Sequence, residues 1–213
     1  TRWPMIWAQN NGFGTFVHIS DIQVDFLYKE GTNTDCHLPL CCHEGNGKAG
    51  AWGDYACDPP LQLLDSLLDA IALIQPDFIV YTGDDPDHAI YNQTRLTNLH
   101  SIHVITQRIN DRFPTLPIFH AIGNHESFPV NMFAGPGADS WLLSSLSQEW
   151  SSLLSPSSLV TVGYGGYYTE RIRPGFRIIA LNTNLFVPDN YWLLANFTDV
   201  AFQFNWLTSI LKQ

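Results

Sequence analysis

The sequence predicts a single layered α/β domain with a mixed sheet. Short runs rich in β-branched and aromatic residues alternate with longer segments in which apolar residues recur with helical spacing. This alternation is typical of domains in which helices pack on a sheet. At 213 residues the chain can bury one sizeable core, so one domain is the default. A third observation concerns chemistry, because the expected strands end in polar motifs.

The expected elements follow an irregular lead-in over residues 1–14, and the domain itself occupies 15–213. They are a strand at 15–20, a disulfide-rich loop at 24–60, a helix at 61–74, a strand at 78–82, a helix at 97–112, a strand at 118–122, a helix at 140–154, an antiparallel pair of strands at 165–171 and 176–182, and a helix at 200–212. We expect Asp139 and Asp199 to cap the helices that follow them. A further strand would normally follow the last helix.

Polar motifs follow three of these strands where each strand ends. They are Asp21 with Gln23, then Gly83-Asp84, then Gly123-Asn124-His125-Glu126. Open α/β sheets bind ligands at the carboxyl ends of their strands. Carboxylates, an amide oxygen and imidazoles there would form a site suited to a pair of divalent metals. An Asp after a strand is also a common turn residue, so the prediction depends on the combination and its order.

The predicted chemistry is hydrolysis of a phosphodiester, which requires hydroxide, charge neutralisation and a proton for the leaving group. We expect Asp84 to bridge the two metals, Asp21 to be a terminal ligand of one, and the carbonyl oxygen of Asn124 to bind the other. His125 would face the phosphate, and His88 would act as the general acid toward the leaving group.

Cysteine usage indicates an oxidising compartment. The four cysteines, which are Cys36, Cys41, Cys42 and Cys57, fall in one turn-rich stretch and suggest two disulfides, although three connectivities are possible. The alternative is a zinc knuckle that uses His37 and His43, but the C-x₂-C pairs usual in such sites are missing. Sequons at Asn92 and Asn196 are compatible with glycosylation in the secretory pathway.

The charge balance excludes one class of partner. Ten basic residues against twenty acidic ones give a formal net charge of −10, which disfavours a sequence-independent grip on nucleic acid. The acidic balance is most simply explained by ordinary solubility. The alternative is an acidic compartment, in which protonated carboxylates repel one another less. No apolar run approaches the length of a transmembrane segment.

The order of the strand-end motifs resembles that of the calcineurin-like metallophosphoesterases, and longer segments resemble acid sphingomyelinase and the acid sphingomyelinase-like phosphodiesterases. Matching segments cover most of residues 15–211: Tyr28-Lys29-Glu30-Gly31-Thr32, Asp35 to Cys42, Trp52-Gly53-Asp54-Tyr55, Cys57-Asp58, Tyr81 to Asp84, Gln93-Thr94-Arg95, Gly123 to Ser127, Pro129-Val130-Asn131, Gly165 to Tyr168, Leu181 to Asn184, and Asn190 to Leu194. The resemblance implies the amino-terminal half of a metallophosphoesterase catalytic domain.

The resemblance also implies cofactors, disulfides and substrates. The family binds two zinc ions, and its disulfides would here be Cys36–Cys41 and Cys42–Cys57. Its members hydrolyse sphingomyelin-type lipids or small phosphodiesters in lysosomal or extracellular settings. A secreted or lysosomal protein is therefore expected.

Two departures from the family pattern modify that expectation. Gln23 stands where the family has a metal-binding histidine, and an amide oxygen is a weaker zinc ligand. Residues 183–213 also contain no histidine, although the family's remaining ligands come from later segments such as a Gly-His-x-His loop.

These departures lead to two expectations. In the first, residues 1–213 alone are inactive and expose apolar surface, which the remaining half of the catalytic domain or another chain covers. In the second, the protein is a non-catalytic descendant that serves as a secreted glycoprotein scaffold or binding module. A nuclease, which only the wider superfamily suggests, is disfavoured by the acidic balance.

Overall fold

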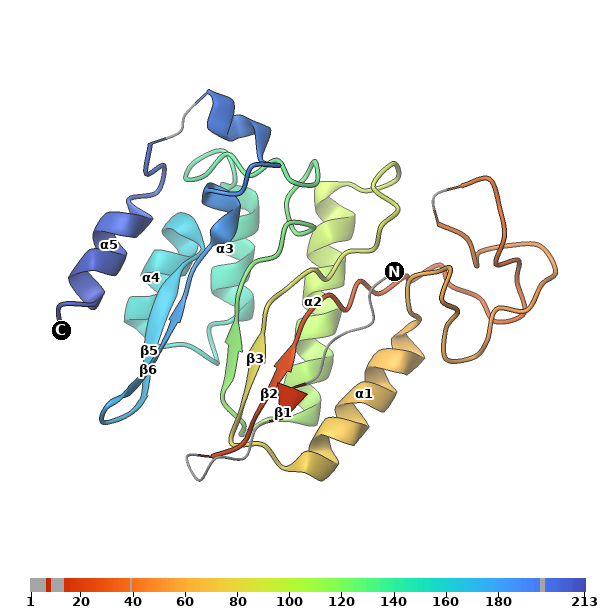
Figure 1. Ribbon diagram of the computed structural model, residues 1–213, viewed down its shortest axis with the longest axis horizontal. Coiled ribbons are helices and arrows are strands. Elements are labelled where there is room, and N and C mark those ends of the chain that lie inside the picture. Colours follow the sequence, from red (N-terminus) through yellow and green to blue (C-terminus); the bar gives the residue numbers. More distant parts are fainter. Residues whose placement is uncertain (1–6, 9–13, 39, 196–197) are drawn as a thin grey trace.

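The computed structural model describes residues 7–8, 14–38, 40–195 and 198–213. Its main sheet has the order β1-β2-β3-β4, in which β2, β3 and β4 are parallel and β1 joins the edge antiparallel to β2 (Figure 1). These strands are β1 (Trp7–Ala8), β2 (Phe16–Ile19), β3 (Phe78–Tyr81) and β4 (Ile118–His120). The predicted α/β fold with a mixed sheet is confirmed, whereas β1 lies in the segment expected to be irregular.

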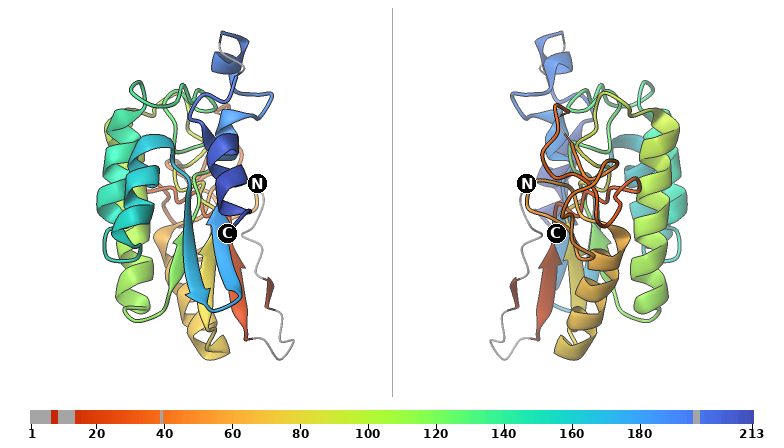
Figure 2. Two further views of the ribbon diagram at one scale, coloured as in Figure 1. Left: turned by 90° about the vertical axis from the view of Figure 1, so that its left-hand side faces the viewer. Right: turned by 90° about the vertical axis from the view of Figure 1, so that its right-hand side faces the viewer.

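One face of the parallel strands carries the first core. Helices α1 (Leu61–Ile74) and α2 (Arg95–Arg112) pack on the strand positions that alternate inward. The two helices lie on the same side of the strands in Figure 2. The core residues are Val17, Ile19, Leu64, Leu68, Ile71, Ile79, Tyr81, Ile105, Ile109 and Ile118. Burying each large apolar side chain stabilises the fold by roughly 1.5–3 kcal/mol. This packing therefore holds the strands and their carboxyl ends in place.

A second core joins the sheet to the later part of the chain. It includes side chains from α3 (Ser140–Glu149), α4 (Pro156–Gly165) and the antiparallel hairpin of β5 (Tyr168–Arg173) and β6 (Phe176–Ala180). Phe78 makes ring contacts with Phe16, Phe119 and Phe176, whose centroids lie 5.2, 5.9 and 5.9 Å away. The hairpin confirms the predicted antiparallel pair.

Three features differ from the expected elements. The helix that begins at Ser140 ends at Glu149, and α4 begins at Pro156 in a segment for which no element was expected. Asp139 does not cap α3, because its carboxylate accepts hydrogen bonds from the backbone of Ala134 and Gly135, both at 2.7 Å. Local turn formation therefore outcompetes capping at this residue.

The last helix, α5 (Gln203–Ile210), is shorter than expected. Its preceding residue, Phe202, is left-handed, with a φ of 52°. The carboxylate of Asp199 nevertheless accepts hydrogen bonds from the amides of Phe204 and Asn205, at 3.0 and 3.2 Å. None of the described helices is long and apolar enough to cross a bilayer.

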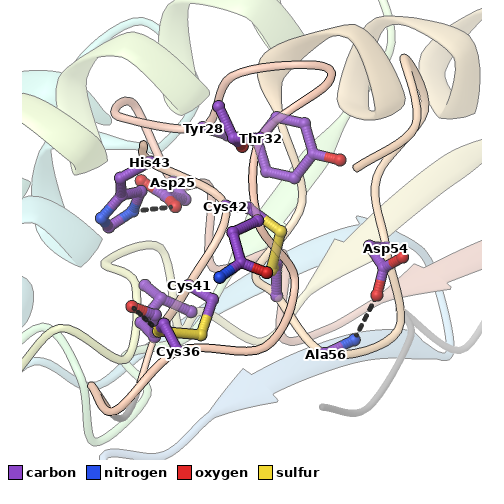
Figure 3. Close-up of a disulfide and its surroundings, with 12 residues drawn as sticks. Asp25, Tyr28, Thr32, Cys36, Cys41, Cys42, His43, Asp54 and Ala56 are labelled. Carbon is purple, nitrogen blue, oxygen red and sulfur yellow. Dashed lines mark hydrogen bonds and ion pairs between the residues drawn. A yellow bond between two sulfur atoms is a disulfide. The ribbon is translucent and has the colours of Figure 1, made fainter. Parts of the chain in front are cut away.

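The long loop at 24–60 is held by two disulfides rather than by regular structure. These are Cys36–Cys41 and Cys42–Cys57, the pairing that the family resemblance implied (Figure 3). The zinc-knuckle alternative is wrong, because all four sulfurs are in disulfides. Backbone hydrogen bonds such as Lys29 N to Cys42 O (2.8 Å) tie the disulfide-bonded segments together.

Candidate metal centre

The carboxyl ends of β2 and β3 place two aspartates in left-handed backbone conformations. Asp21 has a φ of 57°, Gln23 of 45° and Asp84 of 64°. The amide of Asp21 donates to Gly83 O (3.1 Å), and that of Gln23 donates to Asp84 O (2.9 Å), so the two loops are tied together. Left-handed non-glycine residues are uncommon and cluster at functional sites. Asp is one of the few residues that tolerate this conformation, so both loops suit the residue that they carry.

Two glycines allow the loop after β3 to lie directly against the loop after β4. A Cβ on Gly83 would lie 2.4 Å from Gly123 N, and a Cβ on Gly123 would lie 2.2 Å from Asp84 Oδ1. Neither distance is tolerable, so only glycine fits at these positions. The carboxylate of Asp84 therefore rests against the backbone of the third motif.

The buried environment of Asp84 favours a cation beside it. Burial is the largest cause that raises the pKa of Asp84, and the charge of Asp21 raises it further. In the opposite direction, the backbone amide of His125, which donates to Asp84 Oδ1 at 2.8 Å, lowers that pKa. The charge of His125 and the backbone amide of Asn124 lower it as well. Two neighbouring carboxylates, one of which is mostly removed from water, are a common arrangement in cation sites.

Asn124 has its carbonyl oxygen available for a metal. Its Nδ2 donates to Asn131 Oδ1 at 2.8 Å, and its own Oδ1 has no hydrogen-bond partner within the described residues. Gln23 is only 6% exposed, and no hydrogen bond from the described part of the chain engages its side-chain amide. The donor set of Asp21, Asp84 and Asn124, with Gln23 nearby, therefore fits the oxygen ligands of a divalent metal.

Imidazole ligands are scarce at this edge of the sheet. Among the residues that the structure describes, no group of three or more His, Cys, Asp or Glu side chains could hold a metal ion. The donors gathered here are mainly oxygens, whereas protein sites that bind zinc usually include nitrogen or sulfur as well.

The two histidines singled out from the sequence lie against one another. The rings of His88 and His125 meet edge to face, with centroids 4.8 Å apart and an interplanar angle of 73°. His125 is 7% exposed, and burial is the main cause that lowers its pKa. The side chain of His88 is 42% exposed, and its Nδ1 lies 2.9 Å from a carboxylate oxygen of Asp58.

Sequence reasoning missed the residue that holds the third motif in place. Asn98 of α2 is fully buried, and its Nδ2 donates to the backbone carbonyls of His125 and Ser127, each at 3.1 Å. The one signal in the sequence is a polar residue on the apolar stripe that also carries Ile102 and Ile105. Asn98 sets the backbone that presents His125.

Sequence reasoning also missed a buried acidic layer beneath Asp84. Glu126 Oε1 accepts from the amide of Asp85 at 2.8 Å, and the hydroxyl of Tyr81 donates to the Asp85 carboxylate. Burial raises the pKa of Asp85 to about 8 and that of Glu126 well above its usual value. The raised pKa values favour the neutral form of both side chains, which permits them to lie so close together.

Comparison with known proteins decides the family. The profile of the calcineurin-like phosphoesterases matches residues 14–209. The chain belongs to this family. It is 38% identical to human sphingomyelin phosphodiesterase over 208 residues, which are 91% of this chain and 33% of the relative.

Two further relatives also match most of this chain. The chain is 37% identical over 220 residues to sphingomyelin phosphodiesterase B of Dictyostelium discoideum, with 98% of this chain and 34% of the relative covered. It is 34% identical over 207 residues to human cyclic GMP-AMP phosphodiesterase SMPDL3A, with 93% and 44% covered. The chain thus spans about a third of the sphingomyelin phosphodiesterases that it matches.

Asn92, in the first of the two sequons, is exposed just before α2. Burial would therefore not prevent attachment of a glycan to it. Asn196 lies outside the described residues. Glycosylation at both remains a prediction, whereas the disulfides are consistent with passage through the secretory pathway.

Proposed function

We propose that this chain supplies one edge of a metal-dependent phosphodiesterase site of the sphingomyelinase type. The observation that carries the proposal is the convergence of Asp21, Asp84, Asn124 and His125 at the carboxyl ends of three parallel strands. Two zinc ions bound there would activate water as the nucleophile and neutralise charge on the phosphate. Asp84 would bridge them, and Asp21 and Asn124 would each hold one.

The histidines of this chain handle charge and protons. His125 faces the phosphate, where its ring is held by burial and by the contact of its Nδ1 with Asp87 O at 3.3 Å. His88 is half-exposed beside it and protonates the oxygen of the leaving group. Both roles suit hydrolysis of a phosphodiester, whose leaving alkoxide is a strong base.

The substrate class follows from the relatives. Two of them are named as sphingomyelin phosphodiesterases and one as a cyclic GMP-AMP phosphodiesterase, so a sphingomyelin-type lipid or a small phosphodiester is the proposed substrate. Residues beyond this chain, or another chain, would add imidazole ligands and cover the sheet face on which Phe16 and Val80 remain half-buried. The proposed location is secreted or lysosomal.

Metal content and turnover measured together test this proposal. The natively produced protein should hold about two zinc per chain and hydrolyse a sphingomyelin-type or small phosphodiester substrate. Asp84→Asn should lose metal and activity, because the bridge then lacks its charge. Asp77→Asn is the matched control, since Asp77 lies at the opposite end of β3 and accepts from the amide of Thr15. Native protein that holds no zinc would contradict the proposal.

Gln23 favours a second candidate, a non-catalytic scaffold or binding module. Here an amide occupies a position at which the family has a zinc-binding imidazole. Gln23→His separates the candidates. If Gln23 is a tolerated oxygen ligand, the native protein is active and the variant changes zinc affinity only modestly. If the site has decayed, the native protein is inactive, and the variant alone gains zinc.

A further inference from the structure

Asp58 contacts His88 through both of its carboxylate oxygens. Oδ2 accepts the backbone amide of His88 at 2.6 Å, and Oδ1 lies 2.9 Å from Nδ1 of its ring. The two residues are thirty positions apart, and nothing in the spacing of the sequence pairs them. Asp58 is 1% exposed, so this carboxylate is buried with His88 as its partner.

This contact determines which nitrogen of His88 is free. A hydrogen on Nδ1 satisfies the carboxylate, which fixes the tautomer and the plane of the ring. Nε2 is then the nitrogen that can exchange protons with another molecule. The side chain of His88 is 42% exposed, against 2% for that of Asp58, so the pair has one buried end and one open end.

The disulfide loop fixes the position of Asp58. The preceding residue, Cys57, is bonded to Cys42, and the carbonyl of the following residue, Pro59, accepts the amide of Asp25 at 2.9 Å. The carboxylate is therefore held on both sides along the chain. This loop has no regular structure, yet it holds the side chain of Asp58 in a fixed position.

We propose that Asp58 is a positioning residue, which orients the imidazole of His88 so that Nε2 donates the proton. The inference rests on the proposed function, since His88 is the general acid there. In the step itself, the N–H bond at Nε2 of the imidazolium breaks, and the proton goes to the leaving oxygen. The imidazole is left neutral and still bonded to Asp58 through Nδ1.

The charges around the pair support this role. The hydrogen bond that His88 donates to Asp58 is the largest cause that raises the pKa of His88, and burial opposes it. Asp84 also raises that pKa, and His125 faces the same ring. On its buried side, the negative charge of Asp58 repels the charges of Asp25 and Asp87 at longer range. A charged His88 beside this acidic group is thus favoured.

The same loop contains a matched pair that serves as a control. Asp25 is 2% exposed and bonds His43 Nε2 at 2.6 Å, so it is also a buried carboxylate on a histidine (Figure 3). Among the contacts between described residues, however, the ring that meets His125 is that of His88 and not that of His43. Asp25→Asn should therefore cost stability comparable to that lost in Asp58→Asn, without affecting proton donation.

The test is Asp58→Asn in the natively folded protein. Asn keeps the volume and one acceptor oxygen, but its NH₂ group faces a second donor on His88. We expect kcat to fall by about 100-fold, within the usual range for general acid catalysis. The pH profile has an alkaline limb, on which activity is lost as pH rises. This limb should move to lower pH by about one unit. In a His88→Ala background, Asp58→Asn should cost only about 2-fold.

Nitrogen NMR of the His88 ring gives a readout that needs no turnover. Native protein should show the neutral ring protonated on Nδ1, whereas Asp58→Asn should show mixed tautomers and a lower pKa. The Asp25→Asn protein should resemble the native one. An unchanged tautomer and pH profile in Asp58→Asn, with equal losses in both backgrounds, would overturn the inference. Native tautomer fixation in a protein without phosphodiesterase activity would instead refute only the proposed function.

Discussion

The parallel strands and the disulfide loop reach the same site by different physical means. The strands present Asp21, Asp84 and His125 because two helices bury one face of the sheet and two glycines allow close approach. The loop presents Asp58 because two disulfides and a few backbone hydrogen bonds hold an otherwise irregular segment. Packing of regular elements positions the side chains at the strand ends, whereas disulfide cross-links position Asp58.

The difference teaches which perturbations each region resists. A packed sheet tolerates the loss of a surface interaction, but it does not tolerate an extra atom at a close approach. A covalently closed loop tolerates substitution of its exposed side chains, but it depends on each cross-link. The predictions below separate these two behaviours.

The largest effect is expected where the strand-end loops touch. Gly123→Ala would place a methyl carbon 2.2 Å from Asp84 Oδ1, so the loops must separate. We expect a loss of about 3 kcal/mol in the free energy of unfolding, together with loss of metal binding. Gly163→Ala is the control, because its nearest neighbour is a Ser147 side chain at 3.7 Å and a helical Ala is favoured. Denaturant unfolding of both proteins measures this, and equal stabilities would contradict the packing argument.

Removal of the Cys42–Cys57 disulfide should have the next largest effect. It closes a separation of 15 residues, for which chain entropy predicts about 3 kcal/mol, against about 2 kcal/mol for the 5-residue separation of Cys36–Cys41. The double variant Cys42→Ala/Cys57→Ala should also lower activity more than Cys36→Ala/Cys41→Ala, because only the first releases Asp58. Thermal unfolding and kcat would be compared, and equal kcat values would argue against a role of the loop at the site.

Acid should destabilise the sheet through His120. This residue is buried, no described residue bonds its Nε2, and its ring stacks on Trp150 with centroids 5.1 Å apart. Burial lowers its pKa to about 3, whereas the unfolded chain binds the proton near 6.5. Between those values the unfolded state holds more protons, so stability falls by roughly 1 kcal/mol per pH unit as pH decreases.

The variant His120→Phe removes this titration while keeping an aromatic ring on Trp150. The difference in unfolding free energy between variant and native protein should therefore shift in favour of the variant as pH falls from 6.5 toward 4. Urea titrations at several pH values would measure it. A difference that does not change with pH would show that His120 is not buried in its neutral form.

The smallest effect is expected from the ion pairs between α1 and α2. Arg108 contacts Asp65 with an N···O distance of 2.6 Å, and Arg112 contacts Asp69 at 3.1 Å, on half-exposed surface. Exposed pairs of this kind contribute about 0.2–1 kcal/mol. Arg108→Ala should thus change stability by less than about 1 kcal/mol, and less at high salt. A larger loss would mean that packing does not dominate this interface.

Periodic features of the fold could be predicted from the sequence, and single contacts could not. The helix at Leu61–Ile74 was predicted to the residue because apolar side chains repeat along it. Helix α4 was missed because glycines and β-branched residues obscure its period, and tertiary packing outweighs propensity there. The strand-end motifs pointed to Asp21, Asp84 and His125, but Asp58 and Asn98 act through distant contacts that leave no periodic signal.

The left-handed backbone at Asp21 and Asp84 restricts which sequences can occupy this edge of the sheet as relatives diverge. Among the common residues, only Gly, Asn and Asp adopt that conformation at little cost. Most other replacements at 21 and 84 would thus carry a conformational cost of about 1–2 kcal/mol, whatever their chemistry. Substitutions at these two positions should therefore favour Asn or Gly. A relative that no longer hydrolyses a phosphodiester should still have Asp, Asn or Gly there.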